Sequence, residues 1–180
     1  MASTGRRVDA SDNVIRSIAP VRVKNPKNGK STTVLALLDG GSDTDLISEE
    51  LVNILQLEEK YCNVTITTIN STTTTRKGNV TIEVENIDST FDTEIVDAVV
   101  SSILTGPSDI YPADHDLSKF SHLKDLSFDK AEWGVEMLLG NAHQDAWTCF
   151  ELRQGQENEP YARNGQFGWT IGGILGKKNQ

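Results

Sequence analysis

The feature that most constrains this chain is a run at residues 32–38 that is apolar nearly throughout and ends directly at Asp39, Gly40 and Gly41. A continuous apolar run is typical of a β-strand in a sheet that is buried on both faces. A carboxylate placed directly after such a strand, in a turn made of glycines, lies at the rim of the core beside free backbone N–H groups. That environment suits a catalytic acid. It also suits an aspartate that only ends a strand and caps a turn.

The composition excludes several classes of function. A net charge of -9 argues against a nucleic-acid surface, because phosphate binding draws its energy from clustered Lys and Arg. Cys62 and Cys149 stand far apart without a CxxC pattern, so we interpret both as buried thiols. His115, His122 and His143 lack the spacing of a zinc site, and we read them as surface or core histidines. We therefore expect no metal and no cofactor.

Two further absences bear on location. No stretch of the sequence approaches the roughly 18 consecutive apolar residues of a membrane-spanning helix. The first residues include arginines but no apolar region like that of a signal peptide. We therefore expect no membrane partner and a cytoplasmic protein.

The pattern along the chain predicts one mostly β domain with one or two short helices. We expect a disordered leader at residues 1–13, a domain at 14–176 and a tail at 177–180. Within the domain, residues 106–134 are predicted as an insertion of loop and helix, whose apolar spacing favours an amphipathic helix at 116–126. Strands are predicted at 18–23, 32–38, 135–139, 149–152 and 168–175, with a polar loop at 153–166.

Two local patterns are more specific. Ser48 is followed by two glutamates and then by apolar residues on one helical face, which predicts a short helix that Ser48 caps. The segment 62–100 alternates at period two, which predicts an antiparallel meander. Its most exposed hairpin has the tip 71–78, a run of hydroxyl residues too polar to pack. This tip is either a mobile flap or an ordinary surface turn.

Several strings in this order are similar to a known family. ALLDGGSDTDLIS at 36–48 resembles the active-site segment of retropepsin-like aspartic peptidases, and VEMLLG at 135–140 resembles their second signature, whose strand crosses under the catalytic loop. HLKDL at 122–126, NAH at 141–143 and FGWTIGG at 167–173 look like the peptidase domain of Pao/BEL-type retrotransposon polyproteins. In all, the resemblance runs over residues 21–173.

The resemblance implies a retropepsin-like acid protease fold, a closed β-barrel lobe that forms a homodimer. It implies hydrolysis of peptide bonds in a retroelement polyprotein, by water activated between two Asp39 carboxylates that share a proton. A single chain with two lobes needs about 150 residues in each, so the second Asp39 has to come from another copy. The implied active-site loop is Gly40, Gly41 and Ser42, and the implied substrate contacts are Asp43, Thr73, Thr74, Thr75, Leu139 and Gly140.

The sequence departs from the family at Gly40, where the family has a Ser or Thr whose hydroxyl locks the two loops together. This departure favours an alternative, a catalytically weak or inactive retropepsin-like domain that acts as a dimerisation or peptide-binding module. The family's Arg after Gly140 is also missing, since Asn141 and Ala142 follow, so its ion pair is not carried over. Asp43 is either a substrate contact or a turn residue. A third interpretation is an unrelated small β domain whose Asp-Gly-Gly turn is structural.

Overall fold

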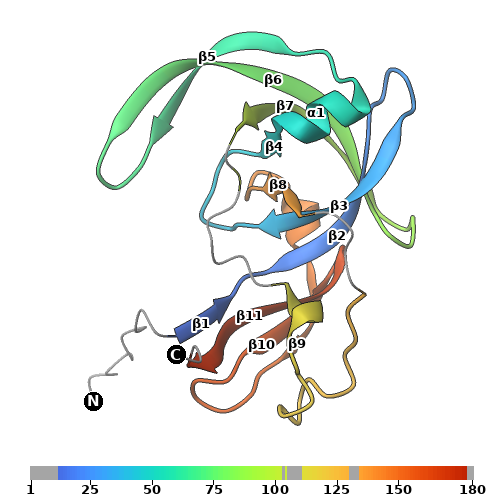
Figure 1. The fold of residues 1–180 in the computed structure, drawn as a ribbon, viewed down its shortest axis with the longest axis vertical. Helices are drawn as coiled ribbons and strands as arrows, with labels where there is room; N and C mark the ends of the chain where they lie inside the picture. The colour runs from blue at the N-terminus through green and yellow to red at the C-terminus, as the bar shows by residue number, and fades with distance from the viewer. Residues whose placement is uncertain (1–11, 103, 105–110, 130–133, 178–180) are drawn as a thin grey trace.

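A computed structural model describes residues 12–102, 104, 111–129 and 134–177. The protein is mostly β, with one short α-helix, a closed six-stranded mixed barrel and a separate four-stranded antiparallel sheet (Figure 1). Most of the predicted leader and tail lies outside the described residues. Among the described residues, no helix has the length and apolar character needed to cross a membrane.

The barrel closes because its first strand pairs with its last. In spatial order its strands are β2 (Ile18–Lys24), β3 (Ser31–Leu38), β8 (Val135–Leu139), β4 (Leu46–Ser48), β7 (Asp92–Ser101) and β6 (Thr72–Asn86). The β2–β6 pairing joins the two ends of this order. The barrel is mixed, since β3 pairs with β8 and β4 pairs with β7 in parallel, while the other pairings are antiparallel.

Strand β3 confirms the prediction of a strand buried on both faces. Val34 and Ala36 point into the main core of the barrel, whereas Leu35 and Leu37 pack in a second cluster on its other side. All four side chains are buried. Since the two faces of β3 are both covered, its sequence reads as a continuous apolar run and not as an alternation.

The predicted short helix is α1 (Glu49–Leu55). The Oγ of Ser48 accepts the N–H of Leu51 at 3.0 Å, as the sequence predicted. A cap of this kind stabilises a helix by about 0.5–2 kcal/mol. The helix ends at Gln56, which has a left-handed φ of 53°, and its buried side chains cover one end of the barrel core.

The predicted meander is present as β5 (Lys60–Thr67), β6 and β7. Strand β5 and the first half of β6 form a long hairpin that extends away from the barrel (Figure 1). Its turn is at residues 68–71 and not at 71–78, because Thr67 pairs with Thr72 and the ladder continues to Lys60 and Asn79. Threonine favours strands, so the hydroxyl run that we assigned to a tip is a paired strand.

The separate sheet has the order β1 (Asp12–Ile15), β11 (Gly168–Lys177), β10 (Tyr161–Gly165) and β9 (Cys149–Arg153). Strand β10 lies within the stretch that we predicted as a polar loop, so that prediction was wrong. Ala162 is its one fully buried residue. Pairing with β9 and β11 on both sides, and not an apolar pattern, makes this segment a strand.

The helix predicted at residues 116–126 is absent. The N–H groups of Phe120, Leu123 and Leu126 each donate to the carbonyl three residues earlier, which makes successive turns. The apolar residues Leu117, Phe120 and Leu123 of this segment are nevertheless buried, against the small sheet. Their spacing of three suits a chain of turns as well as a helix. Residues 106–110 and 130–133 of the predicted insertion lie outside the described part of the chain.

Candidate functional site

Asp39 begins a tight turn at the end of β3. Its backbone N–H donates to the carbonyl of Leu139 at 3.0 Å, and its own carbonyl accepts the N–H of Ser42 at 3.2 Å. The Oδ1 atom accepts the N–H of Gly41 at 2.9 Å. The side chain is half-buried. Asp39 therefore presents a carboxylate at the rim of the barrel, with one of its oxygens oriented by the glycine turn.

The turn lies directly on the end of β8. The carbonyl of Ser42 accepts the N–H of Asn141 at 2.7 Å. A Cβ atom on Gly140 would lie 2.8 Å from the carbonyl oxygen of Ser42 and 2.9 Å from that of Thr44. Those oxygens are backbone and cannot swing aside, so only glycine allows this approach. The end of β8 therefore contacts the backbone of the Asp39 loop.

Asp45 closes the loop, and sequence reasoning missed it. It is 9% exposed, and its Oδ1 accepts the N–H of Gly140 at 2.8 Å. Its Oδ2 lies 2.8 Å from Nε2 of His143. Both carboxylate oxygens therefore anchor the loop to the segment after β8. The only signal in the sequence was the NAH string after Gly140, which gave no reason to pair its histidine with Asp45.

Trp147 also contacts the loop and the end of β8. It ends the short 3-10 helix η2 (Gln144–Trp147), and its Nε1 donates to the carbonyl of Gly140 at 2.9 Å. A Cβ on Gly40 would lie 3.5 Å from the Trp147 ring. The guanidinium of Arg163 lies 5.4 Å from the centre of that ring and donates to the Trp147 carbonyl. Trp147 is partly buried and packs against the barrel core.

The predicted site residues fall into two groups. Asp39, the 40–42 turn, Leu139 and Gly140 come together at the junction of β3 and β8. Asp43 is exposed in the same loop, and its Oδ1 accepts the Thr44 hydroxyl at 3.2 Å. Thr73, Thr74 and Thr75 instead lie along β6 in the hairpin, where Thr74 hydrogen-bonds Thr65 across the strands at 2.9 Å. The Ser42 hydroxyl is used internally, since it donates to the Thr44 carbonyl at 2.8 Å.

The structure corrects our prediction for the two cysteines. Cys62 and Cys149 are exposed, not buried as we predicted, because they lie on the projecting hairpin and on the edge strand β9. Among the residues that the structure describes, no group of three or more His, Cys, Asp and Glu side chains could hold a metal ion.

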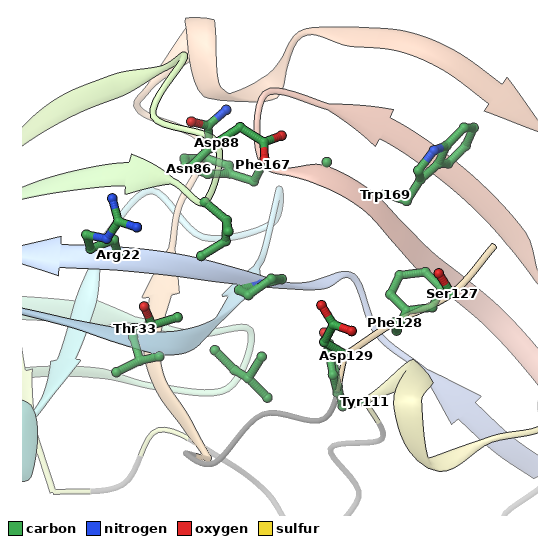
Figure 2. A pocket seen from close by; sticks show the side chains of 15 residues that line it. Arg22, Thr33, Asn86, Asp88, Tyr111, Ser127, Phe128, Asp129, Phe167 and Trp169 are labelled. Atoms are coloured by element: carbon green, nitrogen blue, oxygen red, sulfur yellow. The ribbon is translucent and has the colours of Figure 1, made fainter.

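A cavity of about 570 Å³ lies between the barrel and the small sheet. Figure 2 shows Phe128 and Trp169 on one side of it and Arg22, Thr33 and Asn86 on the other. Arg22 already pairs with Glu85 at 3.0 Å. The Nδ2 of Asn86 is bonded to the Thr90 hydroxyl and to the Gln166 carbonyl. Two polar side chains that line the cavity are thus already hydrogen-bonded within the protein. No residue of the Asp39 loop lines this cavity.

No family model, no characterised protein and no solved structure matches the chain. Its residues and geometry establish a mostly β protein with a closed six-stranded mixed barrel, at whose rim a loop carries the Asp39 carboxylate.

Proposed function

We propose that the protein is an aspartic endopeptidase in which the Asp39 carboxylates of two copies share one proton. The placement of Asp39 carries this proposal: a half-exposed carboxylate directly follows a buried strand, in a glycine turn. In the proposed reaction the ionised carboxylate takes a proton from water while the protonated one donates to the carbonyl oxygen of the peptide bond. The two groups then titrate as one unit.

The rigidity of the loop supports this role. Four hydrogen bonds join it to the end of β8 and the segment that follows, through the Asp39 N–H, the Ser42 carbonyl and both oxygens of Asp45. Two more, from the N–H groups of Gly41 and Ser42 to Asp39, lie within the turn itself. A catalytic group gains from being held in place before the substrate arrives.

The second carboxylate comes, in this proposal, from another copy of the chain. Both oxygens of Asp45 already accept hydrogen bonds from Gly140 and His143. Asp43 points to solvent and accepts from its neighbour Thr44. A twofold axis beside the loop supplies Asp39 with an identical partner in the simplest way.

The hairpin of β5 and β6 supplies the substrate contacts in this proposal. Strand β6 pairs with β7 only from Asn79 onward, so within the described part of the chain its first half is paired with β5 alone. A peptide in extended form can add to a free strand edge through its backbone. Ile69, in the turn, is fully exposed, and in this proposal the tip closes over a bound peptide as a flap. A retroelement polyprotein, cleaved in the cytoplasm, is the proposed natural substrate.

The test is cleavage of a peptide library at mildly acidic pH. We expect turnover by the wild type, a rate that falls toward alkaline pH as the dyad loses its shared proton, and no turnover by Asp39→Asn. Asparagine keeps the oxygen that accepts the Gly41 N–H, so the loop should fold. Asp92→Asn, an exposed site at the start of β7, is the matched control. Cleavage that survives Asp39→Asn would remove Asp39 from the mechanism.

A specific observation favours a second candidate, a catalytically weak or inactive domain that binds peptides or dimerises. Gly40 lacks the hydroxyl that the family places there, and packing does not require this. A Cβ at position 40 meets only the Trp147 ring, at an ordinary contact distance of 3.5 Å. Dimerisation and peptide binding without any turnover would decide for this candidate.

A further inference from the structure

The cavity between the barrel and the small sheet, of about 570 Å³, lies on the outer face of β2 and β3. Pro20 is opposite Leu35 across these strands, and Arg22 is opposite Thr33. Because side chains alternate along a strand, these four residues share the face that turns away from Val21 and the barrel core. Pockets that hold small ligands have volumes of about 300–1,000 Å³. The size of this cavity therefore suits a small organic molecule.

The walls of the cavity are joined by contacts that need no ligand. The Nδ2 of Asn86, at the end of β6, donates to the carbonyl of Gln166 at 2.9 Å. This hydrogen bond ties the end of β6 to the turn between β10 and β11. Phe167, in the same turn, packs edge-to-face on Phe91, with 5.4 Å between the ring centres. The cavity is therefore formed before a ligand enters, so binding requires little ordering of the protein.

Aromatic side chains from separate segments of the chain line much of the cavity (Figure 2): Tyr111, Phe128, Phe167 and Trp169. Tyr111 packs edge-to-face on Phe128, with 6.3 Å between the ring centres. Such rings bury the apolar body of a ligand, and the negative charge of their faces attracts cations. The walls of the cavity thus favour a molecule that is apolar, positively charged, or both.

The basic side chains at the cavity have their charge matched within the protein. Among the described residues, Arg22 is the one basic side chain that lines the cavity, and its Nη1 lies 3.0 Å from Oε2 of Glu85. Arg153 lies beside the cavity, with its guanidinium 4.5 Å from the centre of the Trp169 ring. It is paired with Asp125 at 2.8 Å. Neither arginine is therefore left to attract an anion.

Two carboxylates at the cavity have no such match. Asp88 and Asp129 both line it, and no hydrogen bond or ion pair joins either of them to another residue that the structure describes. Figure 2 shows the Asp129 carboxylate directed into the cavity. A carboxylate can only accept hydrogen bonds. A ligand that bonds to these groups therefore has to supply N–H donors or a positive charge.

We propose that this cavity binds a small organic cation, an amine with an apolar body. The aromatic side chains bury the body of the amine, and Asp88 and Asp129 attract its positive charge. The same two carboxylates repel an anion, and a neutral apolar molecule gains nothing from them. The site is separate from the Asp39 loop, so it does not depend on the proposed function.

Benzylammonium, a phenyl ring that carries one charged amine, is the probe for this site. Isothermal titration calorimetry should show saturable binding with a Kd of about 1 mM or lower. Benzyl alcohol has nearly the same shape without the charge and should bind about tenfold more weakly or worse. Benzoate, which has the opposite charge, should not bind detectably. No binding of benzylammonium, or equally tight binding of benzyl alcohol, would overturn the proposal.

Variants test whether the amine binds in the cavity. Asp88→Asn and Asp129→Asn keep the size of each side chain and remove its charge, so each should raise the Kd of benzylammonium by about threefold or more. Asp145→Asn is the matched control, because Asp145 is also exposed but belongs to η2, outside the cavity. Its Kd should equal that of the wild type. Circular dichroism verifies that each variant is folded. A Kd that changes equally in all three variants, or in none, would contradict the assignment.

An NMR titration of isotopically labelled protein provides an independent readout. The indole N–H of Trp169 should shift as benzylammonium is added, because Trp169 lines the cavity. The indole N–H of Trp147 donates to the carbonyl of Gly140, outside the cavity, and should not shift. A shift of Trp147 without a shift of Trp169 would place the amine at the Asp39 loop and overturn the proposed site. None of these outcomes bears on the cleavage test of Asp39.

Discussion

Asp45 and His143 lie 98 residues apart in the chain, yet only 2.8 Å separates the Oδ2 of the one from the Nε2 of the other. The second oxygen of Asp45 accepts the N–H of Gly140 at 2.8 Å. One buried carboxylate thus ties the end of the Asp39 loop to both sides of the turn that follows β8. The side chain that anchors the loop, Asp45, is therefore outside the Asp-Gly-Gly motif.

Asp45→Ala should destabilise the protein. The substitution leaves the N–H of Gly140 and the imidazole of His143 without their acceptor. An unsatisfied buried donor costs about 1–3 kcal/mol, and urea unfolding would measure a loss in this range. Asp45→Asn should lose less stability, because its amide oxygen can still accept the N–H of Gly140. Asp92→Ala, an exposed control, should stay within about 0.5 kcal/mol of the wild type. Equal stabilities for Asp45→Ala and this control would contradict the role of Asp45.

Gly140→Ala should be among the most harmful single changes in the barrel. Its Cβ would approach two backbone carbonyl oxygens within 2.9 Å, so the loop and β8 would have to separate. Overpacking of this kind costs about 1–3 kcal/mol or more. Gly40→Ala is the matched control, because its Cβ meets only a tryptophan ring at 3.5 Å. Thermal unfolding of the two variants side by side should give a large loss for position 140 and little change for position 40.

Gly40→Ser distinguishes a weakened enzyme from a binding module. We expect higher turnover than in the wild type, because the new hydroxyl can hydrogen-bond to the partner's loop across the proposed axis. One such bond is worth about 0.5–1.5 kcal/mol, which corresponds to a gain of up to about tenfold in rate. Gly40→Ala, which adds the Cβ without the hydroxyl, should show no gain. Peptide binding without turnover in all three proteins would favour the binding module.

The ion pair of Asp125 and Arg153 should make the small sheet sensitive to acid. Arg153 Nη1 lies 2.8 Å from both oxygens of Asp125, and this hydrogen bond lowers the pKa of Asp125 below its ordinary value of 3.8. A carboxylate with a depressed folded pKa contributes stability above its unfolded pKa and loses it as the pH falls through the folded pKa. We therefore expect Asp125→Asn to be less stable than the wild type at pH 7, with the difference shrinking below about pH 4.

Urea unfolding at several pH values checks this prediction. The contact is partly exposed, so salt should also reduce the difference between the two proteins. A difference that stayed constant from pH 7 to the acid limit would mean that the charge of Asp125 has no part in it.

The sequence predicted the elements whose cause is local. The apolar run before Asp39 identified β3, and Ser48 with its following glutamates identified α1. A buried strand and a capped helix can each be recognised from a pattern within a few neighbouring residues. The prediction of a helix at residues 116–126 was wrong for a related reason, since helices and successive turns can both have apolar residues three apart. Strand β10 has no apolar alternation, so nothing local distinguished it from a loop.

The candidate site was predictable only in part. The Asp39 turn and the strand before Gly140 follow from their own sequences and from a resemblance to a family. Asp45, His143 and Trp147 do not, because their roles depend on contacts between segments far apart in the chain. Side-chain patterns within a few residues cannot reveal such contacts, and the topology of the barrel creates them.

The parallel pairing of β3 with β8 also has a consequence for how the molecule is made. Leu38 is aligned with Leu139, so β3 cannot complete its pairing until a strand far later in the sequence is present. Contacts so distant in sequence form slowly, since a long stretch of chain has to close before they add any stability. On the ribosome, β3 would emerge long before β8 was synthesised. The Asp39 loop can therefore take its final shape only after β8 and the segment around Gly140 have been synthesised.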